Sequence, residues 1–229
     1  MPRETLDAKI RHLIDEILVL DSMIEQTTLD SVDALKRRDT EAARRLYAYD
    51  DVVNAKRFEI ENDCIATIAT QQPVMGKDLR LLASILEIVG ELERMGDYAK
   101  GIAKICMMIG DEPHVKPLID IPRMAEISVK MLHRAIGAFV ARDVETARSI
   151  PQQDDEVDAL YNQVYRELVA IILTDPSTID RANHLMWAAH NLERMADRVT
   201  NICERTIYVV TGELKEIESS DDEYSKPRE

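Results

Sequence analysis

The sequence predicts an all-α protein made of two tandem three-helix bundles that repeat one another. Two ten-residue segments, ELERMGDYAK at 91–100 and NLERMADRVT at 191–200, share Leu, Glu, Arg, Met and Asp in register. Glycine is scarce, with 7 residues, and good helix formers such as Leu, Ala, Met, Glu and Arg are abundant. Around both segments apolar residues recur at alternating steps of three and four, which is typical of a helix-bundle seam.

The internal repeat extends beyond the duplicated turn. At an offset of 104 residues, Arg38-Asp39 matches Arg142-Asp143, and Asp50-Asp51 matches Asp154-Asp155. The offset falls to 100 at the duplicated turn because the loop TDPSTIDR is shorter than its counterpart QQPVMGKDLR. Two copies of one structural unit are the simplest explanation.

Each unit is expected to contain three helices. The predicted helices span about residues 4–36, 40–72, 78–110, 122–141, 144–174 and 178–212. Pro73 ends the second helix, and Pro113, Pro117 and Pro122 mark the connection between the units. We therefore expect a first bundle at 1–112, a linker at 113–121, a second bundle at 122–215 and a disordered acidic tail at 216–229, with the bundles joined end to end.

The third helix of each unit shows the packing pattern most clearly. In the first unit the predicted seam is Leu81, Ile85, Ile88, Leu92, Met95, Ala99, Ile102 and Cys106. In the second unit it is Leu185, Ala188, Leu192, Met195, Val199, Ile202, Thr206 and Val209. These residues are predicted to form the core.

Composition excludes several classes of function. A formal net charge of −14 argues against nucleic-acid binding and against a polybasic membrane anchor. Lys104 interrupts the most apolar stretch, so no membrane-spanning helix is expected. Cys64, Cys106 and Cys203 fall within helical patterns and are predicted to be reduced core residues of a cytoplasmic protein.

The duplicated turn places acidic side chains on a partly apolar flank of its helix. Glu93 and Asp97 are four residues apart, and so are Glu193 and Asp197. On a helical wheel each pair shares a flank with apolar residues, whereas ordinary charges such as Glu91 lie on the opposite side. Like charges at this spacing repel one another, and partial burial raises the cost, so a cation or a hydrogen-bond donor should neutralise them.

The second helix of each unit offers partner residues for these acids. Asp50 and Asn54 are four apart in the first unit, and Asp154 and Asp158 match them in the second. Antiparallel packing would gather four oxygen-bearing side chains in one groove, a donor set that suits Mg²⁺, Mn²⁺, Ca²⁺ or iron. A network of Arg and Lys bridges explains the same pattern equally well. The chain contains no Glu-x-x-His motif for a ferritin-like di-iron centre and no paired His/Cys spacing for zinc, and His190 is an optional further ligand.

These motifs together resemble the PhoU family over nearly the whole chain. The resemblance rests on ELERMGDYAKGIAK and NLERMADRVTNICE, on QQPVMGKDLRLL, and on the Asp-rich segments DDVVNAKRFEIE and DDEVDALYNQVY. It implies two three-helix bundles, a regulator that is not an enzyme, and multinuclear clusters of iron, or of Mn, Mg or Zn, at the repeated turns. The metal ligands that it implies are Asp50, Asn54, Glu93, Asp97, Asp154, Asp158, Glu193, Asp197 and Asn201, with Gly101 in place of a ligand at the position matching Asn201.

The resemblance also implies a function. A protein of this family would lower phosphate uptake and silence the phosphate-starvation response, as a cytoplasmic homodimer that links the ATPase subunit of the phosphate ABC transporter to a sensor histidine kinase. Its association with the membrane would be indirect, and nucleic acid would not be a partner. The rival hypotheses are a carboxylate-bridged metal-dependent enzyme on a helical bundle, and a helical adaptor whose acids are only surface charge.

Overall fold

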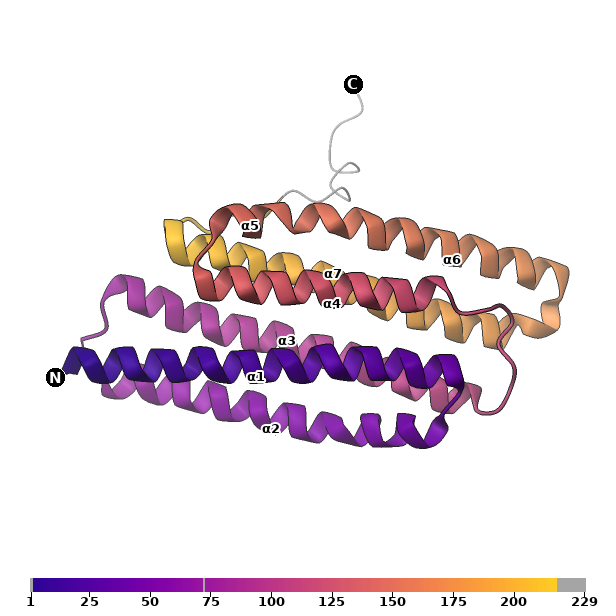
Figure 1. Ribbon diagram of the computed structural model, residues 1–229, viewed down its shortest axis with the longest axis horizontal. Helices are drawn as coiled ribbons and strands as arrows, with labels where there is room; N and C mark the ends of the chain where they lie inside the picture. The colour runs from indigo at the N-terminus through magenta and orange to yellow at the C-terminus, as the bar shows by residue number, and fades with distance from the viewer. Residues whose placement is uncertain (1, 72, 218–229) are drawn as a thin grey trace, which may run out of the picture.

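The protein is all-α in a computed structural model that describes residues 2–71 and 73–217 (Figure 1). The helices are α1 (Pro2–Arg37), α2 (Thr40–Thr70), α3 (Gly76–Ile109), α4 (Asp120–Ala141), α5 (Val144–Ser149), α6 (Asp154–Thr174) and α7 (Ile179–Thr211), with short 3₁₀ turns at Pro151–Gln153 and Pro176–Thr178. Helices α1–α3 form the first bundle, and α4–α7 form the second. Within the described residues no strand is present, which confirms the predicted fold class.

The two bundles lie side by side, so the expectation that they join end to end is wrong. Helix α3 contacts α7 extensively and α1 contacts α4, and one continuous apolar core runs through both bundles (Figure 1). The reason is visible in α3, where buried residues such as Ser84 and Ala103 lie outside the predicted seam. A helix that is buried on more than one face must be covered on more than one side. The second bundle supplies the second cover.

The predicted seams are confirmed. All sixteen residues assigned to the seams of α3 and α7 are buried, from Leu81 to Cys106 in α3 and from Leu185 to Val209 in α7. Cys64, Cys106 and Cys203 are also buried and are free thiols. Burial raises the pKa of each thiol, to about 12 for Cys203. These cysteines therefore pack as small apolar residues, as expected.

The turns that follow α1 and α4 are built alike. Arg38 and Arg142 both adopt positive φ, 59° and 56°, in the left-handed region that favours glycine. In each turn the next residue is an aspartate that caps the following helix: Asp39 accepts from the Ala42 amide at 2.9 Å and Asp143 from the Thr146 amide at 3.0 Å. The matched Arg-Asp pairs of the sequence are thus one structural turn used twice.

The prediction of an unbroken helix over 144–174 is wrong. Helix α5 ends at Ser149, a 3₁₀ turn covers Pro151–Gln153, and α6 begins at Asp154. Pro151 has no amide hydrogen, and its ring clashes with the carbonyl four residues earlier, so the helix is interrupted at this residue. The first bundle has Tyr47 at the matching position, and α2 is continuous there.

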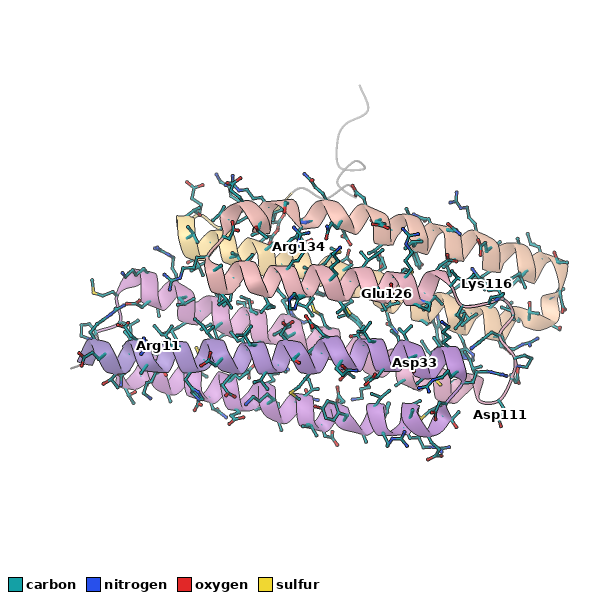
Figure 2. The ribbon with its side chains drawn as sticks, in the orientation of Figure 1. Arg11, Asp33, Asp111, Lys116, Glu126 and Arg134 are labelled. Carbon is teal, nitrogen blue, oxygen red and sulfur yellow. The ribbon has the colours of Figure 1, made fainter. Side chains whose placement is uncertain are left out.

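The connection between the bundles lies at one end of the molecule, where Figure 2 labels Asp111 and Lys116. It runs from the end of α3 at Ile109 to the start of α4 at Asp120, across the predicted 113–121 linker. Residues 213–217 follow α7 without helical structure, and the rest of the predicted tail, from 218 on, lies outside the described residues. In the described part of the chain, no helix has a stretch long and apolar enough to cross a membrane.

Candidate functional site: two acidic faces

The first acidic face is formed by Asp50 and Asn54 of α2 together with Glu93 and Asp97 of α3. Helices α2 and α3 pack against each other, as the sequence predicted. Asp50 has only 4% of its surface exposed, and its Oδ2 accepts a hydrogen bond from Asn54 Nδ2 at 2.9 Å. Asp97 is exposed and Glu93 is half-buried. The burial of Asp50 makes its neutralisation energetically important.

Two basic residues pair with two of the three acids of the first acidic face. Lys100 of α3 donates from Nζ to Asp50 Oδ2 at 2.6 Å, and Arg57 of α2 pairs through Nη1 with Glu93 Oε1 at 2.8 Å. The hydrogen bond to Asp50, with further attraction from Asp50 and Asp97, raises the pKa of Lys100. Bridges of the Arg and Lys kind that the sequence left open are therefore present at this face.

The second acidic face gathers Asp154 and Asp158 of α6 with Glu193 and Asp197 of α7, two helices that also pack together. It has partners of its own within α7. The His190 Nδ1 atom lies 3.0 Å from a Glu193 carboxylate oxygen, and Arg194 Nη1 lies 3.3 Å from an Asp197 carboxylate oxygen. Each of the four carboxylates takes part in polar or electrostatic interactions.

An aromatic residue takes the place of the bridging arginine at the second acidic face. Tyr161 of α6 stands at the position that matches Arg57, and its ring lies 5.9 Å from the ring of His190. Burial, followed by the nearby Glu193 carboxylate and by Tyr165, raises the pKa of Tyr161. The phenol is therefore neutral at physiological pH and contributes no positive charge.

The remaining matched positions widen the contrast between the faces. Thr200 matches Lys100, and Asp158 matches Asn54. The second acidic face thus carries one more carboxylate than the first, and neither basic residue is kept at the matched positions. Four carboxylates with an adjacent imidazole are a donor set that suits Mn²⁺ or iron, whereas the carboxylates Asp50 and Glu93 of the first face are already paired with basic side chains. The residues fit a cation better at the second acidic face, and metal binding there stays a prediction.

Asn201, the ninth predicted ligand, makes its contact with α3. Its Nδ2 donates to Glu91 Oε2 at 3.2 Å across the contact between α3 and α7, and Arg198 Nη1 lies 3.5 Å from the same oxygen. Glu91 is 6% exposed, so the expectation that it is an ordinary surface charge is wrong. The error has the same origin as the end-to-end prediction, because the side of α3 that carries Glu91 packs against the second bundle.

The spacing of the acids did not single out Lys100 and Arg57 as part of the site. Both lie on the acidic flanks, since Lys100 follows Asp97 by three residues and Arg57 follows Asn54 by three. A comparison of these flanks between the two halves would have shown that Thr200 and Tyr161 replace the basic residues. That signal was present in the sequence.

Tandem three-helix bundles with one acidic face each define a class of protein that presents long helical surfaces. A family model described as "PhoU domain" matches residues 17–106 and again residues 121–206. The chain therefore belongs to the PhoU family, as its resemblance indicated.

Relatives of known name support this assignment. A "Phosphate-specific transport system accessory protein PhoU homolog" of Clostridium acetobutylicum is 34% identical over 96% of this chain and 100% of its own length. A homolog of the same name from Aquifex aeolicus is 36% identical over 87% of this chain and 90% of its own length. The crystal structure of PhoU from Pseudomonas aeruginosa, 32% identical, superposes with a TM-score of 0.84 and covers 90% of this chain and 99% of that chain.

Proposed function

We propose that this protein is a negative regulator of inorganic phosphate uptake and of the two-component response to phosphate starvation. It acts in the cytoplasm as an adaptor between the ATPase subunit of a phosphate ABC transporter and a sensor histidine kinase. A homodimer is the proposed working unit, with membrane association only through these partners. Its role is to keep the phosphate-starvation genes silent when phosphate is plentiful.

One observation carries this proposal. Both bundles match the PhoU domain, and the relatives that share nearly the whole chain are named as accessory proteins of phosphate-specific transport. The structure adds a physical reason for an adaptor role, since long parallel layers of helices offer extended surfaces on two bundles. An adaptor that contacts two partners at once needs such surfaces.

The second acidic face is the proposed metal site. Its four carboxylates come from two helices, and binding of Mn²⁺ or iron would draw them together. The bound metal would offset their mutual repulsion and fix α6 relative to α7. In this proposal the first acidic face fixes α2 relative to α3 through Lys100 and Arg57 without any metal.

A carboxylate-bridged metal-dependent enzyme is not favoured. The relatives are named for an accessory role in transport, not for a reaction. Asp50 and Glu93 of the first face are held in ion pairs, which leaves them poorly suited to bind a metal that performs chemistry.

Deletion of the gene, followed by a reporter of phosphate-responsive transcription in rich phosphate, tests the regulatory function. We expect a silent reporter in the parent strain and an active one in the deletion strain, with silencing restored by the wild-type gene. A D158N/D197N variant tests the second acidic face, and a D50N/D97N variant is the matched control for the first. An unchanged reporter in the deletion strain would contradict the regulatory function.

Partner capture is the second test. Cross-linking in cells grown in high phosphate should recover the transporter ATPase subunit or the sensor kinase with this protein. Because the chain is strongly acidic, we expect its contacts to use local basic or apolar patches. Recovery of neither partner would contradict the adaptor role while leaving the family assignment intact.

A further inference from the structure

A third cluster of polar side chains lies between the two bundles. Asp21 and Glu25 of α1 are one helical turn apart, and His133 of α4 faces them, with Nδ1 3.0 Å from Glu25 Oε1. Figure 1 shows α1 and α4 side by side where the two bundles meet, a contact between the bundles that we call the inter-bundle seam. Within the described part of the chain, this is the one group of three such side chains whose potential ligand atoms all lie within 4.8 Å of one another. We call it the seam cluster.

Asp21 is the member whose environment calls for a ligand. It is 5% exposed, and among the described residues no group hydrogen-bonds to its Oδ1 atom. Burial, and then repulsion by Glu25, raise the pKa of Asp21 to about 7. A buried carboxylate without a partner is costly, and a bound cation removes that cost.

The repeat shows that the fold does not require polar side chains at this place. At the offset of 104 residues, Ala125 matches Asp21 and Val129 matches Glu25, while Leu29 is the counterpart of His133. The three side chains at the repeat-related positions of α4 and α1 are therefore all apolar. Packing alone does not explain why one set of positions carries two acids and a histidine while the repeat-related set is apolar. This difference indicates a binding role for the polar set.

We propose that Asp21, Glu25 and His133 bind a first-row divalent cation, with Zn²⁺ as the preferred ion, at the contact between α1 and α4. Two carboxylates and one imidazole suit borderline cations such as Zn²⁺, Mn²⁺ and Fe²⁺, and water completes the coordination. The ion can enter from solvent because the His133 side chain is 74% exposed.

This site would join the first bundle to the second. Glu25 and Asp21 belong to the first bundle and His133 to the second, so the bound ion adds a cross-link that the predicted sites on the acidic faces do not provide. Binding displaces any proton from Asp21 and from the coordinating His133 nitrogen, so it releases protons and weakens at low pH. The proposal does not depend on the phosphate-regulatory function.

The test uses the full-length protein, freed of metal with a chelator, and ZnCl₂ as the probe. Long-range ¹H–¹⁵N NMR reports each of the 5 histidine rings separately, and the H133Q variant identifies the His133 signal. The variant D21N removes the buried ligand oxygen, and circular dichroism checks that it remains helical. H12Q is the matched control, because His12 also lies near two carboxylates, 3.9 Å from Glu16 and 3.7 Å from Asp63.

We expect the first equivalent of Zn²⁺ to shift the His133 ring signal in the wild type and in H12Q. D21N should weaken this binding by about tenfold or more, since even changes outside the ligand set commonly cost 10–100-fold in metal affinity. Equilibrium dialysis should find one tightly bound Zn²⁺ fewer in H133Q than in H12Q. An unshifted His133 signal would overturn the proposal, and so would a helical D21N that binds Zn²⁺ as tightly as the wild type.

Discussion

The two acidic faces share one scaffold and differ in how their charge is balanced. In the first, Lys100 and Arg57 reach across from neighbouring helices and pair with Asp50 and Glu93. In the second, Thr200 and Tyr161 occupy the matched positions, and Asp158 adds a carboxylate where the first face has Asn54. Both copies of the duplicated turn carry the same two acids, but the second copy keeps neither Lys100 nor Arg57, and its Glu193 and Asp197 lie near His190 and Arg194 instead.

In our proposal, this difference separates a structural role of the first face from a binding role of the second. Carboxylates that form ion pairs with basic residues of the same chain stabilise the contact between two helices and have little remaining affinity for a cation. The second face has a fourth carboxylate and the His190 imidazole beside Glu193, a donor set that suits an external cation. We therefore expect the first acidic face to respond mainly to mutation of its basic residues, and the second mainly to added metal.

The largest expected effect is the loss of Lys100. K100M keeps the length of the side chain but leaves Asp50 buried without its cation, which should cost about 3 kcal/mol, the low end for a broken buried pair. The low end applies because Lys100 is 29% exposed. Urea denaturation followed by circular dichroism measures the change.

T200M is the matched substitution in the second bundle and should change stability by less than about 1 kcal/mol. Adding D50N to K100M should restore most of the loss, because the double variant no longer buries an unpaired charge. Equal losses in K100M and T200M would show that the two faces are balanced in the same way.

Added metal should produce the next largest effect, and mainly at the second acidic face. A cation that binds only the folded state adds about 2.7 kcal/mol at a hundredfold excess over its Kd. In an H133Q background, which disables the seam cluster, Mn²⁺ should raise the melting temperature. The variant D158N/D197N should lose this shift and D50N/D97N should keep it.

The opposite assignment would follow if D50N/D97N abolished the shift and D158N/D197N did not. Equal shifts of the melting temperature in H133Q and in its D158N/D197N and D50N/D97N derivatives, with no metal found by elemental analysis, would mean that neither acidic face is a metal site. The repeated acids would then act through partner binding or through Arg and Lys bridges alone.

Helical periodicity was sufficient to predict the fold within each bundle. The alternating steps of three and four in α3 and α7 gave the buried seams, and the matched Arg-Asp pairs located two equivalent turns. Pro151 was present in the sequence and should have divided the predicted 144–174 helix. That error came from extending a pattern across a residue that cannot continue a helix.

Contacts between the bundles could not be derived from the same pattern. A helical wheel places Glu91 on the flank opposite Glu93 and Asp97, where a charged residue is normally exposed. Only the position of the second bundle shows that this side of α3 is covered and that Asn201 donates to Glu91. The seam cluster is a similar case, since Asp21 and His133 are far apart in sequence and meet through packing of α1 on α4.

A third prediction compares Asp21 with its counterpart Ala125 through pH. In the presence of a chelator, the folded-state pKa of Asp21 is about 7, against 3.8 for an ordinary aspartate exposed to water. Between these two values the folded state binds more protons than the unfolded state, so stability falls as pH rises towards 7. From pH 5 to pH 8 the loss attributable to Asp21 should be about 2 kcal/mol.

D21A, which installs the residue found at position 125, should flatten this part of the stability profile. Urea denaturation at several pH values, with and without Zn²⁺, measures it. The wild type with Zn²⁺ should lose less stability over this range, because the cation stabilises the ionised carboxylate. A D21A profile as steep as that of the wild type would show that another group causes the pH dependence.

The smallest expected effect comes from the paired turns after α1 and α4. Arg142 adopts a φ of 56°, where a residue with a Cβ is strained by about 1 kcal/mol and glycine is not. R142G should therefore stabilise the protein by about 0.5–1 kcal/mol.

In the first bundle, Arg38 has the same strain, but its Nη1 donates to the carbonyl of Asp111 at 2.9 Å and ties the turn to the end of α3. R38G loses that bond along with the strain, so its net change should be closer to zero. Thermal unfolding of the two variants side by side measures the difference, and a larger gain from R38G than from R142G would show that the Asp111 contact adds nothing to stability.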